Sequence, residues 1–197
     1  MVDVELEAVI FDLDGVIRHY DRQHEREIER RHALEPGSLL VTAFGGELGY
    51  EFMCGRIDHD EFAAELAVLI GSAPAAREFV DMRAAVDHDA VALVRRVQER
   101  LPVALLTNGS QRTRTELAEA GLADAFDHVF NSAETGVPKP APQAYLNVVE
   151  ALGSPVGATA FVDDHRPNVD AAIATGLVGH HYVGLDDLRV FLGSLAE

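Results

Sequence analysis

Cysteine and tryptophan are almost absent from this chain of 197 residues, which has one cysteine and no tryptophan. A single cysteine excludes a framework of intrachain disulfides and a metal site built from several thiolates. We expect Cys54 to be a small buried hydrophobic residue, because the sequence offers no obvious partner that would activate its thiol.

Basic residues are scarce as well. The chain has 16 lysines and arginines against 33 aspartates and glutamates, which gives a formal net charge of −17. This balance argues against nucleic acids and anionic membrane surfaces as partners. An anionic substrate would need local cations or a metal ion to overcome the negative field of the protein.

Long apolar runs are missing too. No run approaches the length of a membrane-spanning helix, and no charged-then-apolar leader opens the chain. We therefore expect a cytoplasmic protein. Because 48% of the residues are hydrophobic, the chain can bury the core of one domain with a small insertion.

The apolar pattern changes along the chain. Residues 8–11 form a short continuous apolar run, typical of a strand that is buried on both faces of a parallel sheet. Residues 19–86 show helical patterns and no convincing strand. They include a densely charged helix at 19–31, which we expect to be largely solvated. They also include a helix from Asp58 or His59 and another from Pro74, the latter carrying Phe79, Met82 and Val86.

From residue 87 onward, strands and helices alternate. Further strands are expected at residues 103–106, 129–130, 159–162 and 178–183. This alternation predicts an α/β fold with a Rossmann-like, doubly wound parallel sheet. The expected core domain comprises residues 1–18 and 87–197. Residues 19–86 would form a small, all-helical cap domain inserted after the first strand.

Polar residues stand where the apolar runs stop. They are Asp12 and Asp14 after the first run, Thr107 and Asn108 after the second, Lys139 near the third, and Asp163 and Asp164 after the fourth. The carboxyl ends of parallel strands meet at one edge of a sheet. Four carboxylates with one lysine and one hydroxyl suit a phosphoryl group together with Mg²⁺. The lysine, the hydroxyl and the backbone N–H groups of residues 108–111 would hold phosphate oxygens.

Other features have plainer explanations. Taken alone, the acidic residues after the first strand are also consistent with a simple acidic turn. The glycines between residues 45 and 49 lack the Gly-Lys-Ser/Thr ending of a phosphate loop, so we expect a turn between helices there. Nine histidines invite a zinc hypothesis. However, His180 and His181 are adjacent on an expected strand and should point to opposite faces.

Four short motifs occur in a fixed order along the chain. They are Asp12-Leu13-Asp14-Gly15-Val16, Leu106-Thr107-Asn108-Gly109, Val137-Pro138-Lys139-Pro140 and Val162-Asp163-Asp164-His165-Arg166-Pro167-Asn168. Each motif is weak evidence alone, but the ordered set spans essentially the whole chain. With these motifs in this order, the chain resembles the haloacid dehalogenase superfamily, in the branch that carries a helical cap after the first motif.

The resemblance implies a Mg²⁺-dependent phosphatase with a covalent mechanism. Asp12 would attack phosphorus and become an aspartyl phosphate. Asp14 would protonate the leaving oxygen and later deprotonate the water that hydrolyses the intermediate. Thr107 and Lys139 would hold the transferring group, and they count with these two aspartates as catalytic residues.

The resemblance also implies a phosphate-binding set and a metal-binding set. Phosphate would be bound by Thr107, Asn108, Gly109 and Lys139. Mg²⁺ would be bound by Asp12, by the backbone carbonyl of Asp14, by Asp164, and by Asp163 either directly or through water. Asn168 matches a supporting position at which other members often carry aspartate.

Three alternatives stay open on the same fold. A 2-haloacid dehalogenase needs the nucleophilic aspartate but neither the metal nor a second acid, so Asp14 disfavours it. A phosphomutase differs only in where the phosphoryl group is sent. A non-catalytic binding or regulatory domain would usually have lost one of the motif residues.

The substrate is expected to be a small phosphorylated metabolite. Within the class of small soluble phosphate monoesters, sugar phosphates are the first expectation, by family analogy alone. Selection should depend on the cap and on residues 19–21, with Tyr50 and Arg56 as further candidates. The pattern is compatible with a monomer and with a homodimer.

Overall fold

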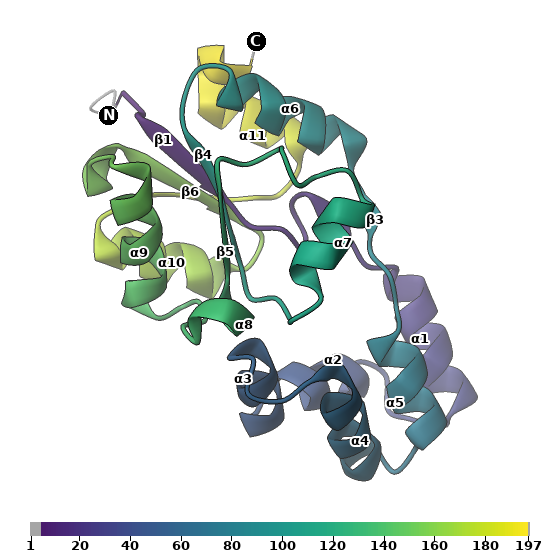
Figure 1. Ribbon diagram of the computed structural model, residues 1–197. Helices are drawn as coiled ribbons and strands as arrows, with labels where there is room; N and C mark the ends of the chain where they lie inside the picture. Colours follow the sequence, from purple (N-terminus) through teal and green to yellow (C-terminus); the bar gives the residue numbers. More distant parts are fainter. Residues whose placement is uncertain (1–4, 197) are drawn as a thin grey trace.

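A five-stranded parallel sheet forms the centre of this protein in a computed structural model that describes residues 5–196. The strand order is β5-β4-β1-β6-β7, and Figure 1 shows β1, β4, β5 and β6 of this sheet. The strands are β1 (Ala8–Phe11), β4 (Val103–Thr107), β5 (His128–Asn131), β6 (Thr159–Asp163) and β7 (Val178–His181). All four neighbouring pairs are parallel. The predicted α/β fold with a parallel sheet is confirmed.

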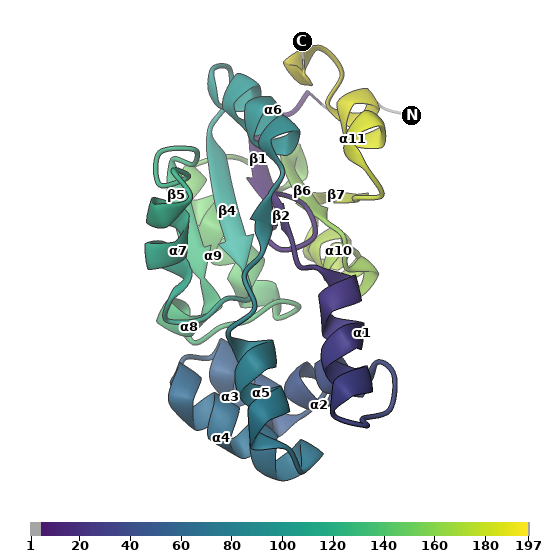
Figure 2. The same cartoon turned by 90° about the vertical axis from the view of Figure 1, so that its right-hand side faces the viewer.

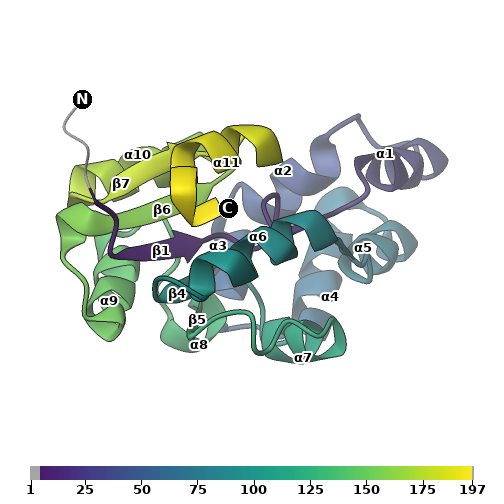
Figure 3. The ribbon, with the colours of Figure 1, turned by 90° about the horizontal axis from the view of Figure 1, so that it is seen from above.

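Helices cover both faces of the sheet, because side chains along each central strand alternate between two apolar layers. Val9 and Phe11 pack into one layer, and Ile10 packs into the other. The flanking helices are α6 (His88–Gln98), α9 (Pro142–Leu152), α10 (Arg166–Thr175) and α11 (Leu185–Leu192). The layer of Phe11 lies against α6 and α11, which are seen over the sheet in Figure 3. The layer of Ile10 lies against α9 and α10.

Short elements complete the core. They are α7 (Thr113–Glu119), α8 (Ser132–Thr135), the 3-10 helix η1 (Val156–Ala158) and the 3-10 helix η2 (Gly193–Ala196). Helix α11 ends at residue 192, and η2 follows it. The four-residue α8 is too short to leave a periodic pattern in the sequence. Among residues 5–196, no helix combines the length and apolar character needed to cross a bilayer.

Five helices are inserted between β1 and α6, and we call them the cap helices. They are α1 (Arg22–Arg31), α2 (Ser38–Phe44), α3 (Glu47–Met53), α4 (His59–Ile70) and α5 (Ala73–Val80). Figure 2 shows them below the sheet, on the side to which the strand β4 points. Their apolar faces pack against one another, with Phe52, Phe62 and Leu66 among the buried residues. Cys54 is buried, as predicted.

The cap helices are seated on the core. The Gln111 side chain of the core donates a hydrogen bond to the Gly55 carbonyl at 3.1 Å. Gly55 itself lies so close to the backbone of Ala133 in α8 that an added Cβ would overlap it. Arg83 and Glu116 form an exposed ion pair at 3.3 Å. The structure therefore has the cap in contact with the core.

Two short strands correct the expectation that residues 19–86 hold no strand. β2 (Arg18–His19) pairs in antiparallel fashion with β3 (Ala85–Val86) where the chain leaves and re-enters the core. Helix α5 ends at residue 80. Met82 and Val86 therefore lie outside the helix, and their prediction as helical residues was wrong. A strand of two residues has no detectable period, and the pairing partner lies more than 60 residues away along the chain.

Helix α1 is less solvated than its charges predicted. Glu25, Ile28 and Glu29 are buried, and Glu29 is only 1% exposed. The Glu29 carboxylate accepts hydrogen bonds from the backbone N–H groups of Gly37 at 2.8 Å and Leu39 at 3.0 Å. Gly37 precedes α2 and has no side chain to cap it, so Glu29 instead accepts from two backbone N–H groups at the start of that helix.

Candidate active site

The sheet order brings the predicted polar residues to one edge. Asp12 directly follows the central strand β1, between the ends of β4 and β6. Thr107 ends β4 and Asp163 ends β6, so both lie beside Asp12. All three are buried, with exposed fractions of 7% or less. The topology thus gathers residues that lie about 150 positions apart along the chain.

Lys139 links two of the carboxylates. Its Nζ lies 2.8 Å from Asp12 Oδ1 and 2.7 Å from Asp163 Oδ2. It also lies 5.4 Å from the centre of the Phe161 ring, within cation–π range. The Lys139 side chain is almost fully buried, and this residue is the only lysine in the sequence. A buried ammonium between two buried carboxylates is the central feature of the site.

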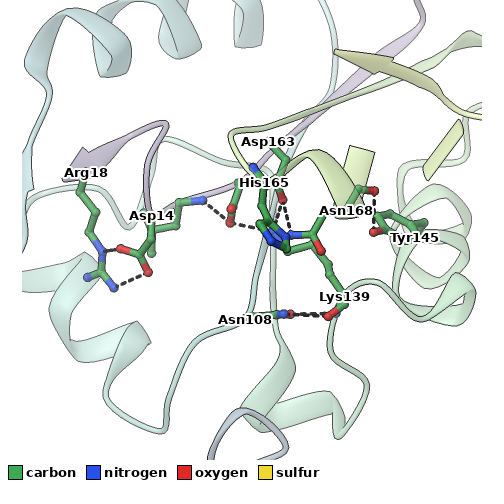
Figure 4. Close-up of polar contacts among 10 residues, drawn as sticks. Asp14, Arg18, Asn108, Lys139, Tyr145, Asp163, His165 and Asn168 are labelled. Carbon is green, nitrogen blue, oxygen red and sulfur yellow. Dashed lines mark hydrogen bonds and ion pairs between the residues drawn. The ribbon is translucent and has the colours of Figure 1, made fainter. Parts of the chain in front are cut away.

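Asp163 is held from three sides. Besides Lys139, its Oδ2 accepts a hydrogen bond from Asn168 Nδ2 at 3.0 Å, and its Oδ1 accepts one from the His165 backbone N–H at 2.7 Å (Figure 4). The buried Tyr145 hydroxyl donates to the Asn168 carbonyl at 2.9 Å. Tyr145 was missed from the sequence, because a tyrosine on the apolar face of a helix is indistinguishable from a core residue.

Asn108 positions the loop that carries Lys139. Its side-chain amide donates to the Lys139 carbonyl and its side-chain oxygen accepts from the Lys139 N–H, both at 2.8 Å. The side chain is thus committed to backbone atoms, which leaves the backbone N–H of residue 108 for the phosphate role we predicted. At Gly109, an added Cβ would overlap the Thr113 hydroxyl and crowd Asn131. The tight turn after β4 therefore excludes larger residues.

Three carboxylates form a candidate metal centre. Asp12, Asp163 and Asp164 each place one oxygen within 4.8 Å of the other two. Hard oxygen ligands suit Mg²⁺, and Lys139 offsets only one of three negative charges. Gly15, with φ at +93°, passes so close to the Asp164 carboxylate that a Cβ would overlap it. These three carboxylates are therefore suitable ligands for a divalent cation.

The protonation equilibria follow from burial and charge. Burial raises the pKa of Asp12, while the Lys139 ammonium opposes that shift and Asp163 adds to it. Burial alone would lower the pKa of Lys139, but the two carboxylates outweigh burial and raise the pKa, so the ammonium stays charged. Burial and the charge of Asp163 raise the pKa of Asp164. A cation at this centre would favour the ionised carboxylates.

Asp14 lies outside this cluster. Its carboxylate is 2.6 Å from Arg18 Nε, and Figure 4 shows it turned toward Arg18 and away from Lys139. Arg18 also contacts Glu116 of α7 at 2.8 Å. The sequence analysis did not single out Arg18. An arginine four positions after an aspartate usually signals a helical pair, and this segment is not helical.

A cavity of about 300 Å³ opens beside Asp14, between the cap helices and the core. Its walls include Asn108, Gly109 and Tyr20. Tyr20 was expected near the substrate, and it lies at this cavity. Neither Tyr50 nor Arg56 lines it. Arg56 instead pairs with Glu51 at 2.6 Å and lies over the Tyr50 ring.

A family model described as haloacid dehalogenase-like hydrolase matches residues 6–176. The chain belongs to this family. The resemblance predicted from the four motifs is therefore confirmed, and the protein is a haloacid dehalogenase-like hydrolase.

Curated relatives of this hydrolase include phosphatases of similar length. Enolase-phosphatase E1 of Azotobacter vinelandii is 31% identical over 195 residues, covering 90% of this chain and 85% of the relative. The sesquiterpene phosphatase astK of Aspergillus oryzae is 29% identical over 180 residues, covering 88% of each chain.

Solved structures share the fold of this hydrolase. A haloacid dehalogenase family enzyme of Bacteroides thetaiotaomicron, in complex with magnesium and inorganic phosphate, superposes with a TM-score of 0.76. The alignment covers 94% of this chain and 99% of the other, at 20% sequence identity. At this identity the match establishes the common fold.

Proposed function

We propose that this hydrolase is a Mg²⁺-dependent phosphatase that cleaves a small phosphate monoester through an aspartyl phosphate. The observation that carries the proposal is the buried Lys139, which pairs with Asp12 and Asp163 in a cluster of three carboxylates next to a cavity. The phosphatase relatives named above support the same reaction class.

In the first half-reaction, an Asp12 carboxylate oxygen attacks phosphorus. A new P–O bond to Asp12 forms as the P–O bond to the substrate alcohol breaks. Asp14 gives its proton to the leaving alcohol oxygen. For this step the Asp14 carboxyl must leave Arg18 and form a hydrogen bond to the leaving oxygen instead.

In the second half-reaction, a water molecule attacks the phosphorus of the aspartyl phosphate. Asp14 takes a proton from that water, and the bond between Asp12 and phosphorus breaks, so both residues return to their starting states. Lys139, Thr107 and the backbone N–H groups of residues 108 and 109 hold the phosphoryl oxygens. Asp12, Asp164 and the Asp14 carbonyl would hold Mg²⁺, with Asp163 direct or through water; the cation supplies charge stabilisation.

The test is phosphate release from p-nitrophenyl phosphate and a panel of monoesters, with Mg²⁺ and after treatment with EDTA. We expect EDTA to lower the rate by at least about a hundredfold, because the cation compensates the carboxylates and the phosphoryl charge. Readdition of Mg²⁺ should restore the rate.

Other outcomes separate the alternatives. Chloride release from a 2-haloacid without metal would contradict the proposal and identify a dehalogenase. Transfer of the phosphoryl group to a second position of a sugar phosphate, without inorganic phosphate, would identify a mutase. Folded protein that turns over no ester across the panel with Mg²⁺ would contradict the proposal as tested and revive the binding or regulatory domain.

A further inference from the structure

The cavity beside Asp14 has two different walls. Its core wall is polar and includes Asn108 and Gly109 of the candidate active site. Its cap wall is apolar, with contributions from α2, α3, α4, α5 and the residues that follow α5. The principal apolar residues on this wall are Leu40, Phe44, Phe52, Phe62, Phe79 and Met82. A group attached to a phosphate in the active site would meet this apolar wall.

The charged groups of the cavity are already paired within the protein. Arg18 contacts Asp14 at 2.6 Å and Glu116 at 2.8 Å. Arg22 contacts Glu25 at 2.8 Å. A sugar placed here would give up hydrogen bonds to water and would have to compete with these ion pairs for new ones.

Besides Asn108, Ser110 and Thr113 on the core side, two further polar side chains line the cavity, and neither is charged at neutral pH. Burial raises the pKa of Tyr20 to about 12, so it stays a neutral phenol. Burial lowers the pKa of His59, so its ring is neutral, and it packs edge-on against Phe52 with 5.1 Å between ring centres.

Phe44 is the residue of the cap wall whose side chain is the most clearly exposed. It is 39% exposed, although its ring lies 5.7 Å from the Phe62 ring and 6.4 Å from the Phe79 ring. The contacts of Gln111 and Glu116 with the cap show that the cap already touches the core. Phe44 thus stays partly uncovered with the cap seated, in the cavity that Asp14 also lines.

We propose that the alcohol part of the substrate is a hydrocarbon group, so that the enzyme selects phosphate monoesters of apolar alcohols over sugar phosphates. The hydrocarbon covers the exposed face of Phe44 while the phosphate lies at Asp12. This proposal rests on the phosphatase function proposed above and specifies its substrate class.

The first test is a series of n-alkyl phosphates from ethyl to octyl, compared with glucose 6-phosphate. We expect kcat/KM to rise about threefold to fourfold for each added methylene until the cavity is filled, since each buried methylene adds a similar increment of transfer free energy. A flat series, or a preference for glucose 6-phosphate, would overturn the proposal while leaving the phosphatase function intact.

A second arm measures binding without turnover. The dissociation constants of the matching alkylphosphonates, which have no ester bond to cleave, are measured by calorimetry with Mg²⁺ present. Affinity should rise with chain length by the same factor. If no ester is hydrolysed but affinity still rises, the apolar site stands and the phosphatase function fails. If the affinity for alkylphosphonates does not depend on the length of their alkyl chain, the proposed substrate class is wrong.

Two variants on one helix locate the site. Phe44→Ala should lower kcat/KM for hexyl phosphate about tenfold, with a smaller loss for ethyl phosphate, because only the longer ester reaches that ring. Val41→Ala is the matched control, since Val41 is also on α2, is 69% exposed and does not line the cavity. It should leave both values unchanged. Equal losses for both esters in Phe44→Ala would contradict the assignment.

Discussion

Asp12→Asn is expected to abolish Mg²⁺-dependent phosphate release, with kcat lower by on the order of 10⁴-fold or more. The amide keeps the shape of the carboxylate but is a very poor nucleophile, so the P–O bond to residue 12 no longer forms. It also removes one of the three carboxylates of the metal centre. The rate is measured by phosphate release at saturating Mg²⁺ and substrate.

A surface variant serves as the matched control for this loss. Asp186 is an exposed residue of α11 that pairs only with Arg189, at 2.9 Å, among the ion pairs of residues 5–196. Asp186→Asn should retain full activity, and both variants should unfold cooperatively in urea. Substantial activity in a folded Asp12→Asn protein would rule out Asp12 as the nucleophile.

Lys139→Met should produce the largest loss of stability of any single substitution in the site. It leaves Asp12 and Asp163 buried without their shared cation, and removing one partner of a buried ion pair costs about 3–5 kcal/mol. The free energy of unfolding is measured by urea titration in EDTA at neutral pH. Activity should fall as well, because the phosphoryl oxygens lose a buried positive charge.

The pH dependence of this loss follows from the pKa directions. The folded-state pKa of Lys139 is raised, so its contribution is complete below the ordinary lysine pKa and disappears as pH rises through the raised value. At low pH the deficit of the variant should also shrink, because protonation of Asp12 removes a buried unpaired charge. The deficit should therefore be largest near neutral pH.

Arg166→Met is the control for Lys139→Met. Arg166 forms an exposed ion pair with Asp170 at 2.7 Å, and such pairs contribute only about 0–1 kcal/mol. Its free energy of unfolding should be close to that of the wild type at every pH. If Lys139→Met matched the wild type as closely as this control does, the buried ion-pair network would not stabilise the fold.

Much of the fold could be predicted because its signals are local. The runs at 8–11, 103–106 and 159–162 are continuous and apolar, which indicates central strands of a parallel sheet. Once those strands are parallel, the residues at their carboxyl ends must share an edge. Asp12, Thr107 and Asp163 therefore lie together, as the pattern predicted.

The features that were missed depend on contacts between distant segments. The β2–β3 pair joins residues 18–19 to residues 85–86 and has no period of its own. Glu29 is buried because α2 presents unpaired N–H groups to it, and a charge pattern along α1 does not reveal that partner. An exception is the orientation of Asp14 toward Arg18, a contact over four positions that follows from the path of the chain after Gly15.

The apolar cavity wall could not be predicted from the sequence for a related reason. Phe44 and Phe79 fit a helical pattern that is equally typical of residues in a core and of residues that line a cavity. Only the placement of the cap helices over the core shows that Phe44 remains exposed beside the candidate active site. Sequence reasoning therefore gave the reaction chemistry more readily than the identity of the substrate.

The most direct test of the central claim is to trap the phosphorylated enzyme. Wild-type protein is mixed with a rapidly cleaved monoester and Mg²⁺, quenched in acid within milliseconds, digested and examined by mass spectrometry. We predict one phosphoryl group on the peptide that contains Asp12, formed at least as fast as turnover and absent from Asp12→Asn. Phosphate release at full rate with no phosphorylated Asp12 would contradict the covalent mechanism, because water would then attack the substrate directly.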